Sequence, residues 1–191
     1  MIRYAVLFAL LFPIASPAMA DTEYCDDMWF VRNQIYDRAG YCFQSPMGKA
    51  VFDNSDCTGT QVSVAKADRE ILAYVEGVEA DLACKLDTSK PRAPVERVDL
   101  RLQLEDLAAL DDIGGAGCFG YQGPAFDLHA ARRAGSTILG QVNTGDDIRY
   151  LFRSFGGQHD WIYTEAQRDG KTISLGWSQR LEVDLCDSFA G

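Results

Sequence analysis

Residues 28–57 decide the fold of the first half of the chain and read MWFVRNQIYDRAGYCFQSPMGKAVFDNSDC. At helical spacing, Met28, Val31 and Ile35 form one apolar stripe. The opposite side is polar, with Arg32, Asn33, Gln34 and Asp37. Two aspartates precede the stripe and favour the positive end of a helix dipole, and a glycine follows it where a left-handed residue ends many helices. We therefore predict a helix from Asp27 to Ala39.

Aromatic and polar residues follow a definite order within this stretch. The positions concerned are Trp29, Arg32, Asn33, Tyr36, Arg38, Gly40, Tyr41, Phe43 and Phe52. Their pattern resembles the YARHG domain, a small module of bacterial exported proteins that is named after its Tyr-Ala-Arg-His-Gly run. The resemblance covers about residues 28–85. Here the run reads Tyr36-Asp37-Arg38-Ala39-Gly40, so it departs from the family at its second and fourth positions.

The motif residues Asn33, Tyr36, Arg38 and Gly40 allow a catalytic or a structural interpretation. Ala39 stands in place of the histidine, which removes the one side chain of the motif that titrates near neutral pH. An acid/base role is weakened accordingly. We favour a structural role, in which Arg38 donates hydrogen bonds to the carbonyl oxygens of a turn.

The chain opens with the features of a secretory signal peptide. Arg3 is followed by an apolar run over residues 5–14 and by a small-x-small cleavage signal at residues 18–20. We predict cleavage near Ala20 and a soluble mature protein, periplasmic or secreted, that begins at Asp21. No later segment reaches the roughly 20 apolar residues that a membrane-spanning helix needs, so no membrane span is expected.

All six cysteines lie after this leader. An even number of cysteines in an exported protein indicates disulfides. If the chain divides into two modules, four cysteines belong to the first, which leaves three possible connectivities there. The connectivity that we favour joins the start of the first helix to the end of the last, and the helix exit to the segment carrying Phe52. The favoured pairs are Cys25–Cys84, Cys42–Cys57 and Cys118–Cys186.

The composition is acidic, with a formal net charge of -10 at pH 7. Nucleic acids and anionic membrane surfaces are poor partners for such a chain, because like charges repel. We expect no nucleic-acid partner, and we expect the charge to serve solubility, with a cationic ligand as a weaker alternative.

The middle of the chain contains a second helix and a linker. Apolar residues recur every three or four positions over residues 66–84, which predicts an amphipathic helix packed on the first. Residues 88–94 are polar and contain two prolines, so we place the domain boundary there. Residues 98–104 alternate between apolar and polar as a strand would, whereas the leucines over residues 100–110 also form a helical stripe. The residue types are good helix formers, so we favour a helix.

Beyond Cys118, short apolar runs are separated by glycine, aspartate and asparagine turns, as in an antiparallel barrel or sandwich. The candidate strands cover residues 126–130, 136–142, 148–153, 161–165, 174–177 and 180–185. The order of Leu139-Gly140, Gly145-Asp146, Trp161 and Gly176-Trp177 resembles a bacterial SH3-type domain over about residues 120–185. An uncharacterised domain often follows the YARHG module in bacterial exported proteins, and the second half of this chain resembles that domain.

The predicted architecture is therefore of the α+β class. Its parts are a signal peptide (1–20), a YARHG-like helical module (21–88), a linker with a connecting helix (89–117) and an SH3-like β-barrel (118–191).

Residues of recognisable catalytic or metal chemistry are few. The two histidines, His129 and His159, have no nucleophile at a familiar spacing. Residues 172–176 lack the first glycine of a nucleophile elbow. Residues 53–56 have oxygen ligands but lack the remainder of a calcium-binding loop, so we interpret them as a turn. We predict no cofactor and no metal.

The SH3-type resemblance implies a peptide-binding surface of aromatic side chains flanked by acidic loops. The candidate ligand-binding residues are Tyr121, Tyr150, Asp160, Trp161, Tyr163 and Trp177. The alternative for Trp161 and Trp177 is a place in the core. Tyr121, in a loop rich in glycine, is expected to be the most exposed of the contacts.

These features favour a non-enzymatic exported protein of the bacterial envelope that binds a peptide, cell-wall or protein partner through the barrel. The alternative is a cell-envelope hydrolase, or an accessory subunit or inhibitor of one. A hydrolase predicts a cleft in which titratable groups with shifted pKa values converge.

Overall fold

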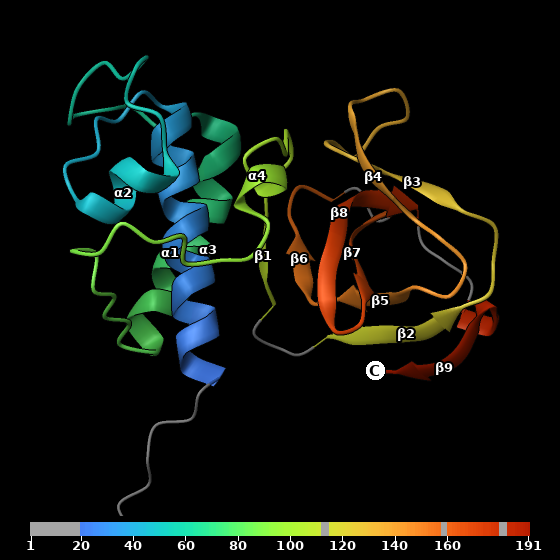
Figure 1. Ribbon diagram of the computed structural model, residues 1–191. Coiled ribbons are helices and arrows are strands. Elements are labelled where there is room, and N and C mark those ends of the chain that lie inside the picture. The colour runs from blue at the N-terminus through green and yellow to red at the C-terminus, as the bar shows by residue number, and fades with distance from the viewer. Residues whose placement is uncertain (1–19, 112–114, 158–159, 180–182) are drawn as a thin grey trace, which may run out of the picture.

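The computed structural model describes residues 20–111, 115–157, 160–179 and 183–191 (Figure 1). Apart from Ala20, the predicted signal peptide lies outside these residues, as does His159. A helical lobe and a sheet lobe lie side by side, with α4 and β1 between them. The helical elements are α1 (Ala20–Arg38), α2 (Pro46–Val51), η1 (Lys66–Asp68), α3 (Arg69–Asp81), α4 (Val98–Arg101) and η2 (Val183–Leu185). The strands are β1 (Ala108–Leu110), β2 (Ala116–Tyr121), β3 (Phe126–His129), β4 (Ile138–Val142), β5 (Asp147–Tyr150), β6 (Phe152–Ser154), β7 (Trp161–Arg168), β8 (Lys171–Gln179) and β9 (Cys186–Ala190).

Helix α1 forms the centre of the helical lobe, as the apolar stripe predicts. Met28, Val31 and Ile35 are buried, and α3 packs against them with Ile71 and Val75. The helix begins at Ala20 rather than at the predicted Asp27. Tyr24 and Cys25 hold the additional turns in place: the Tyr24 hydroxyl donates to the Asp111 carbonyl at 2.9 Å, and Cys25 is disulfide-bonded.

The exit of α1 is fixed by a tight turn and a ring stack. Gly40 has a positive φ of 85°, and a Cβ atom at this position would lie 2.7 Å from Thr58 Oγ1, so any larger residue would be strained here. Phe43 and Phe52 then fold back onto the helix, with their rings stacked at 4.6 Å between centroids. The turn at Gly40 and the two phenylalanines that follow it thus direct the chain back onto α1.

Three disulfides connect the pairs that we favour from the sequence: Cys25–Cys84, Cys42–Cys57 and Cys118–Cys186. The last pair ties β2 to β9, which are neighbours in the sheet. In the chain-entropy model, closing a loop of the size of that between Cys42 and Cys57 stabilises a fold by about 3 kcal/mol.

The predicted connecting helix over residues 98–110 is wrong in extent. Only α4 is helical, and β1 follows it after a turn. The three residues of β1 are all buried: Ala108 packs towards the sheet lobe and Ala109 and Leu110 towards the helices. Burial on both faces and pairing with β6 therefore override the local helix propensity of the leucine-rich segment.

The sheet lobe is an antiparallel β-sandwich of a seven-stranded sheet, in the order β4-β3-β8-β7-β5-β2-β9, and the two-stranded sheet β1-β6. Within the described residues the larger sheet runs from edge β4 to edge β9 without closing, so the predicted SH3-like barrel is not confirmed. The predicted strand over residues 148–153 divides into β5 and β6, which belong to different sheets. Of the predicted strand over residues 180–185, residues 180–182 lie outside the described residues and residues 183–185 form a 3₁₀ turn; β9 was not predicted.

The two lobes share one apolar core. Leu107, Ala109, Leu110 and Phe155 belong to the cluster that surrounds α1. The segment that we predicted as a linker with a connecting helix (89–117) therefore packs between the two lobes and contributes to their shared core. None of the helices in the described ranges has both the length and the apolar character to cross a membrane.

Candidate functional site

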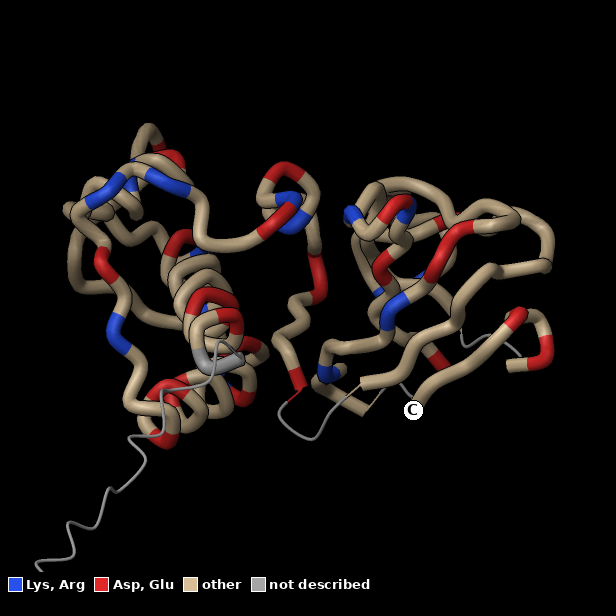
Figure 2. Tube along the Cα trace, turned by 60° about the horizontal axis from the view of Figure 1, so that its bottom comes forward, with Lys and Arg blue, Asp and Glu red and all other residues tan. Residues whose placement is uncertain are grey.

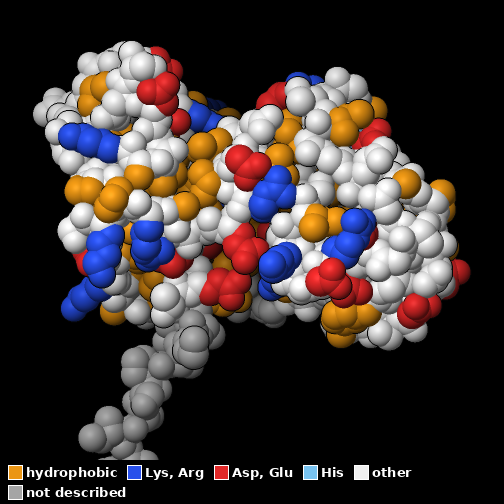
Figure 3. All heavy atoms as spheres, in the orientation of Figure 1, with side chains coloured by type: hydrophobic (Ala, Val, Ile, Leu, Met, Phe, Trp, Pro, Cys, Tyr) orange, Lys and Arg blue, Asp and Glu red, His pale blue; other side chains and the backbone are white. Residues whose placement is uncertain are grey.

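A cavity of about 430 Å³ lies between the lobes, and we call it the interlobe cavity. The first turns of α1 form one wall, the segment before α4 a second, and strands β5, β6, β7 and β8 a third. In the space-filling view, acidic and basic side chains gather along the hollowed seam between the lobes (Figure 3). The charged residues that line the cavity are Glu23, Asp26, Asp27, Glu96, Arg101, Arg149 and Glu165.

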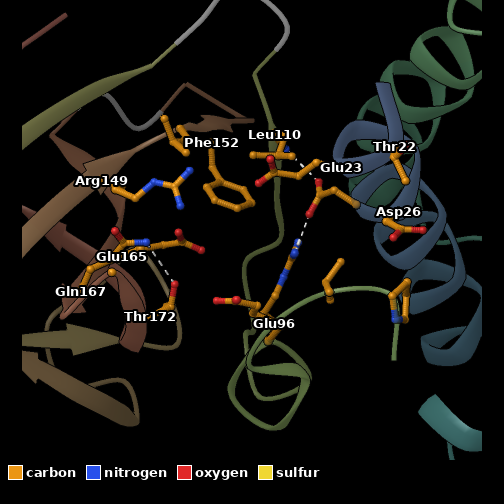
Figure 4. Close-up of a pocket in the computed structure, with 16 residues that line it drawn as sticks. Thr22, Glu23, Asp26, Glu96, Leu110, Arg149, Phe152, Glu165, Gln167 and Thr172 are labelled. Atoms are coloured by element: carbon orange, nitrogen blue, oxygen red, sulfur yellow. Dashed lines mark hydrogen bonds and ion pairs between the residues drawn. The ribbon is translucent and has the colours of Figure 1, made fainter. Parts of the chain in front are cut away.

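A buried ion pair forms the floor of this cavity. Arg101 Nη1 lies 2.5 Å from Asp27 Oδ1, and both side chains are almost completely buried. The second carboxylate oxygen of Asp27 accepts a hydrogen bond from the Leu110 backbone N–H at 2.9 Å (Figure 4). The Arg101 guanidinium lies over the ring of Phe30, 4.7 Å from its centroid. Each charge is therefore compensated, and the pair joins α1 to α4 and β1.

Within the described part of the chain, Glu165 is a buried acidic residue without such compensation. It is 8% exposed and lines the interlobe cavity from β7. Among the described residues its carboxylate has no hydrogen bond and no ion pair within 4 Å. Burial raises the pKa of Glu165 from its ordinary value of 4.5 to about 7; Arg101 and Arg149 oppose the shift, while Asp27 and Glu96 add to it. This carboxyl group therefore changes charge near neutral pH.

Arg149 stands directly opposite Glu165 in the register of β5 and β7. The two side chains extend side by side from the sheet towards the space between the lobes, and Glu23 and Asp26 lie on the α1 side of that space (Figure 4). Although they are opposite each other, no guanidinium nitrogen of Arg149 lies within 4 Å of a carboxylate oxygen of Glu165. Since neither side chain has an ion-pair partner among the described residues, both can contact a third group.

Polar groups deeper in the same region lack partners as well. The Tyr163 hydroxyl and Arg101 Nε are buried and have no hydrogen-bond partner within the described chain. Burial raises the pKa of Tyr163 well above its ordinary value, so the phenol stays neutral. Together with Glu165, these groups make the region beneath the cavity more polar than a normal core.

Three of the predicted ligand-binding aromatics lie in the core instead. Tyr121, expected to be the most exposed, is only 2% exposed and donates its hydroxyl hydrogen to the Pro124 carbonyl oxygen at 2.9 Å. Tyr163 and Trp177 are fully buried and meet edge to face at 5.6 Å. Trp177 Nε1 donates to a backbone carbonyl at 2.8 Å, so its polar atom is satisfied inside. The core interpretation of Trp177 is thus the correct one.

The other predicted residues lie nearer the surface. Trp161 is half-buried and meets His129 edge to face, with 5.6 Å between ring centroids. Asp160 is exposed beside it, whereas Tyr150 is half-buried with its hydroxyl enclosed and unpartnered within the described chain. Trp161 and His129 line a depression of about 450 Å³, which we call the aromatic groove. Its other walls include Phe126, Asp127 and Gln179.

The YARHG-like motif residues have structural contacts. Asn33 Nδ2 donates to the Trp29 carbonyl at 2.7 Å, and Tyr36 packs against Tyr41. Arg38 donates from Nη1 to the Glu105 carbonyl at 3.1 Å and from Nη2 to the carbonyl of the preceding leucine. Arg38 thus donates to backbone carbonyl oxygens, as the structural interpretation predicts, and these belong to the segment between α4 and β1. Arg38 therefore anchors the connecting segment to α1.

The Asp53 side chain accepts from the Ser55 backbone N–H at 2.8 Å, which confirms the turn predicted there. Within the ranges that the structure covers, no group of three or more potential ligands could hold a metal ion.

Sequence reasoning missed Glu165 and Arg149, although one signal was present. Trp161, Tyr163 and Glu165 alternate along one strand and therefore face the same side of the sheet. An inward-facing carboxylate follows from that alternation. The approach of α1 and α4 to it depends on tertiary structure, which the sequence pattern does not contain.

Comparison with known proteins finds two family models that match separate parts of the chain, and residues from both parts line the interlobe cavity. A family model described as "Domain of unknown function (DUF4453)" matches residues 83–191, which is more than half of the chain. The chain belongs to the DUF4453 family. A YARHG domain model matches residues 6–80. No curated protein and no solved structure matches the chain. The DUF4453 domain contributes Arg101, Arg149 and Glu165 to the interlobe cavity, and the YARHG domain contributes Asp27.

Proposed function

We propose that this DUF4453 protein is a non-enzymatic exported binding protein of the bacterial cell envelope. It engages a peptide, cell-wall or protein partner through the aromatic groove of its sheet lobe. Its leader is removed near Ala20, and the mature chain acts in the periplasm or outside the cell. The disulfides and the YARHG domain fit such an oxidising compartment.

The observation that carries this proposal is the half-buried Trp161 at the aromatic groove. A large ring with one accessible face supplies apolar contact area at low entropic cost, and such residues dominate many binding surfaces. His129 supports the ring from one side, and Asp127 and Asp160 provide acidic groups nearby. The relation to bacterial SH3-type domains, inferred from the Trp161 and Gly176-Trp177 pattern, supports an extended peptide as the partner.

The experiment is a titration of the mature protein with soluble peptidoglycan peptides, followed by calorimetry. We expect Trp161→Ala and Phe126→Ala each to weaken binding at least about tenfold, which corresponds to about 1.4 kcal/mol. Phe119→Ala is the matched control, because Phe119 is 45% exposed on β2 and does not line the groove. Equal affinity of all three variants and the wild type would overturn the proposal.

A second candidate, a cell-envelope hydrolase, is favoured by one observation. Glu165 in the interlobe cavity has the pKa of an acid/base group that works near neutral pH. A peptidoglycan digestion assay tests this candidate, because a hydrolase loses its activity in Glu165→Gln and keeps it in Glu76→Gln, a change on the exposed side of α3. Absence of digestion by the wild type removes the candidate.

A further inference from the structure

We propose that the interlobe cavity binds a free α-amino acid that carries a second ammonium group. Arg149 receives the carboxylate, Glu165 receives the α-ammonium group, and the acidic rim formed by Glu23 and Glu96 receives the second ammonium group. This site is separate from the aromatic groove and goes beyond the proposed function.

The placement of Arg149 and Glu165 carries the first part of the argument. Side chains directly opposite each other on antiparallel strands have Cβ atoms about 5 Å apart, so a guanidinium and a carboxylate are held side by side. Neither has an ion-pair partner in the described chain. An α-amino acid has a carboxylate and an ammonium group on one carbon, which matches such a pair of opposite charges. A planar guanidinium also binds a carboxylate through two parallel hydrogen bonds.

Burial of Glu165 is the second and independent observation. A carboxylate that is 8% exposed and unpartnered loses hydration without receiving a compensating contact. Its side chain lines the interlobe cavity next to Arg149 (Figure 4). An ammonium group bound there would supply the missing hydrogen bonds and the opposite charge.

The acidic residues at the cavity rim that have no ion-pair partner among the described residues favour a ligand with a second ammonium group. Asp27 is neutralised by Arg101, and Asp26 lies 3.2 Å from Arg92. Glu23 and Glu96 are exposed at the rim and have no ion-pair partner within the described residues. Acidic residues lie on both lobes and on the segment between them (Figure 2). Among the described residues that line the cavity, the unpaired acidic groups Glu23, Glu96 and Glu165 therefore outnumber the unpaired basic group, Arg149.

The size and the apolar part of the lining fit a ligand of this class. A volume of about 430 Å³ lies in the range of small-molecule sites and is too small for a folded partner. Leu110, Leu151 and Phe152 provide an apolar surface between the charged groups. A short methylene chain between the two ends of the ligand would lie on that surface.

Binding of this ligand depends on pH. The groups that act on Glu165 are Arg101 of α4, Arg149 of β5, Asp27 of α1, Glu96 of the connecting segment and Tyr163 of its own strand. The ammonium group binds the ionised form of Glu165, and burial keeps this carboxyl partly protonated at pH 7. Affinity therefore falls as the pH drops below 7, by up to about tenfold per pH unit.

The test is calorimetric titration of the mature full-length chain with lysine, cadaverine and norleucine at pH 8. We expect lysine to bind, and cadaverine and norleucine to bind at least about tenfold more weakly, since each lacks one of the required charges. Cadaverine that binds as tightly as lysine would show that no carboxylate is recognised. Norleucine that binds as tightly as lysine would show that the second ammonium group contributes nothing, and either result overturns the proposal.

Variants connect the binding to the site. Glu165→Gln and Arg149→Gln should each weaken lysine binding at least about tenfold, and Glu165→Gln should also abolish the pH dependence between pH 5 and 7. Glu76→Gln and Arg69→Gln are the matched controls, because both residues are exposed and do not line the cavity. Circular dichroism confirms that each variant is folded. Lysine binding that is unchanged in both cavity variants, or absent from the wild type at about 10 mM ligand, contradicts the proposal.

Discussion

Replacement of Glu165 by glutamine should stabilise this protein at neutral pH and leave its stability unchanged at acidic pH. The carboxyl group has an ordinary pKa of 4.5 and a pKa of about 7 in the folded state, because burial disfavours its charge. The raised pKa means that the folded state holds the proton more tightly than the unfolded state does. Glu165 therefore contributes stability below pH 4.5, and this contribution is lost as the pH rises through 7.

The magnitude follows from the same two pKa values. One pKa unit corresponds to 1.36 kcal/mol, so ionisation of Glu165 costs the folded state about 3 kcal/mol at pH 8. Glutamine has nearly the same shape and never ionises, so Glu165→Gln avoids this cost. The difference in unfolding free energy between the variant and the wild type should grow by up to about 1.4 kcal/mol per pH unit from pH 4.5 and level off above pH 7.

Urea unfolding measures this difference when wild type, Glu165→Gln and the control Glu76→Gln are compared between pH 4.5 and 8 with the disulfides intact. Other titrating groups affect all three proteins equally and cancel in the comparison. The control difference should stay near zero, because Glu76 is exposed. A Glu165→Gln difference that is independent of pH would refute the reasoning, since it would mean that the carboxyl group is solvated and titrates normally.

Further predictions concern the framework that holds the cavity. Asp27→Asn should destabilise the fold by about 3–5 kcal/mol in urea unfolding, because it leaves the Arg101 charge buried without its counter-ion; a loss below about 1 kcal/mol would contradict the ion-pair argument. Gly40→Ala should lower the melting temperature because of the positive φ, with a loss of at least about 1 kcal/mol, and an unchanged melting temperature would count against it. Replacement of both Cys42 and Cys57 by serine should lower the free energy of unfolding by about 3 kcal/mol, because the disulfide restricts the unfolded chain. An unchanged free energy of unfolding in urea would contradict this prediction.

Periodicity and local chemistry were sufficient for the two long helices of the helical lobe, but they predicted neither α2 nor the first turns of α1. The stripe of Met28, Val31 and Ile35 predicted α1, and a similar stripe predicted α3, because a helix that buries one face must repeat its apolar residues at that spacing. The division into modules reduced the possible connectivities to three, and the one that we favoured from the expected positions of the helices is the observed one. The helical stripes depend on residues that are close in sequence, which is why the local pattern predicts them.

Features that depend on contacts between distant segments could not be predicted in this way. Residues 98–110 have the propensity of a helix, yet β1 forms because α1 and β6 enclose it from two sides. Tyr121 lies in a glycine-rich segment that suggested exposure, but Pro124 and Phe126 enclose its ring and hydroxyl. The interlobe cavity joins Asp27 to Glu165, and nothing in the local pattern of either residue indicates that they share a site.

The measurement that tests the proposed binding function most directly is an NMR titration of the isotope-labelled mature protein with soluble peptidoglycan peptides. If the protein binds its partner through the aromatic groove, saturable shift changes should occur at the Trp161 indole, at His129 and at Phe126, which line that groove. The exposed ring of Phe119 on β2 should not respond. Absence of saturable changes, or changes confined to residues outside the groove, would contradict the account.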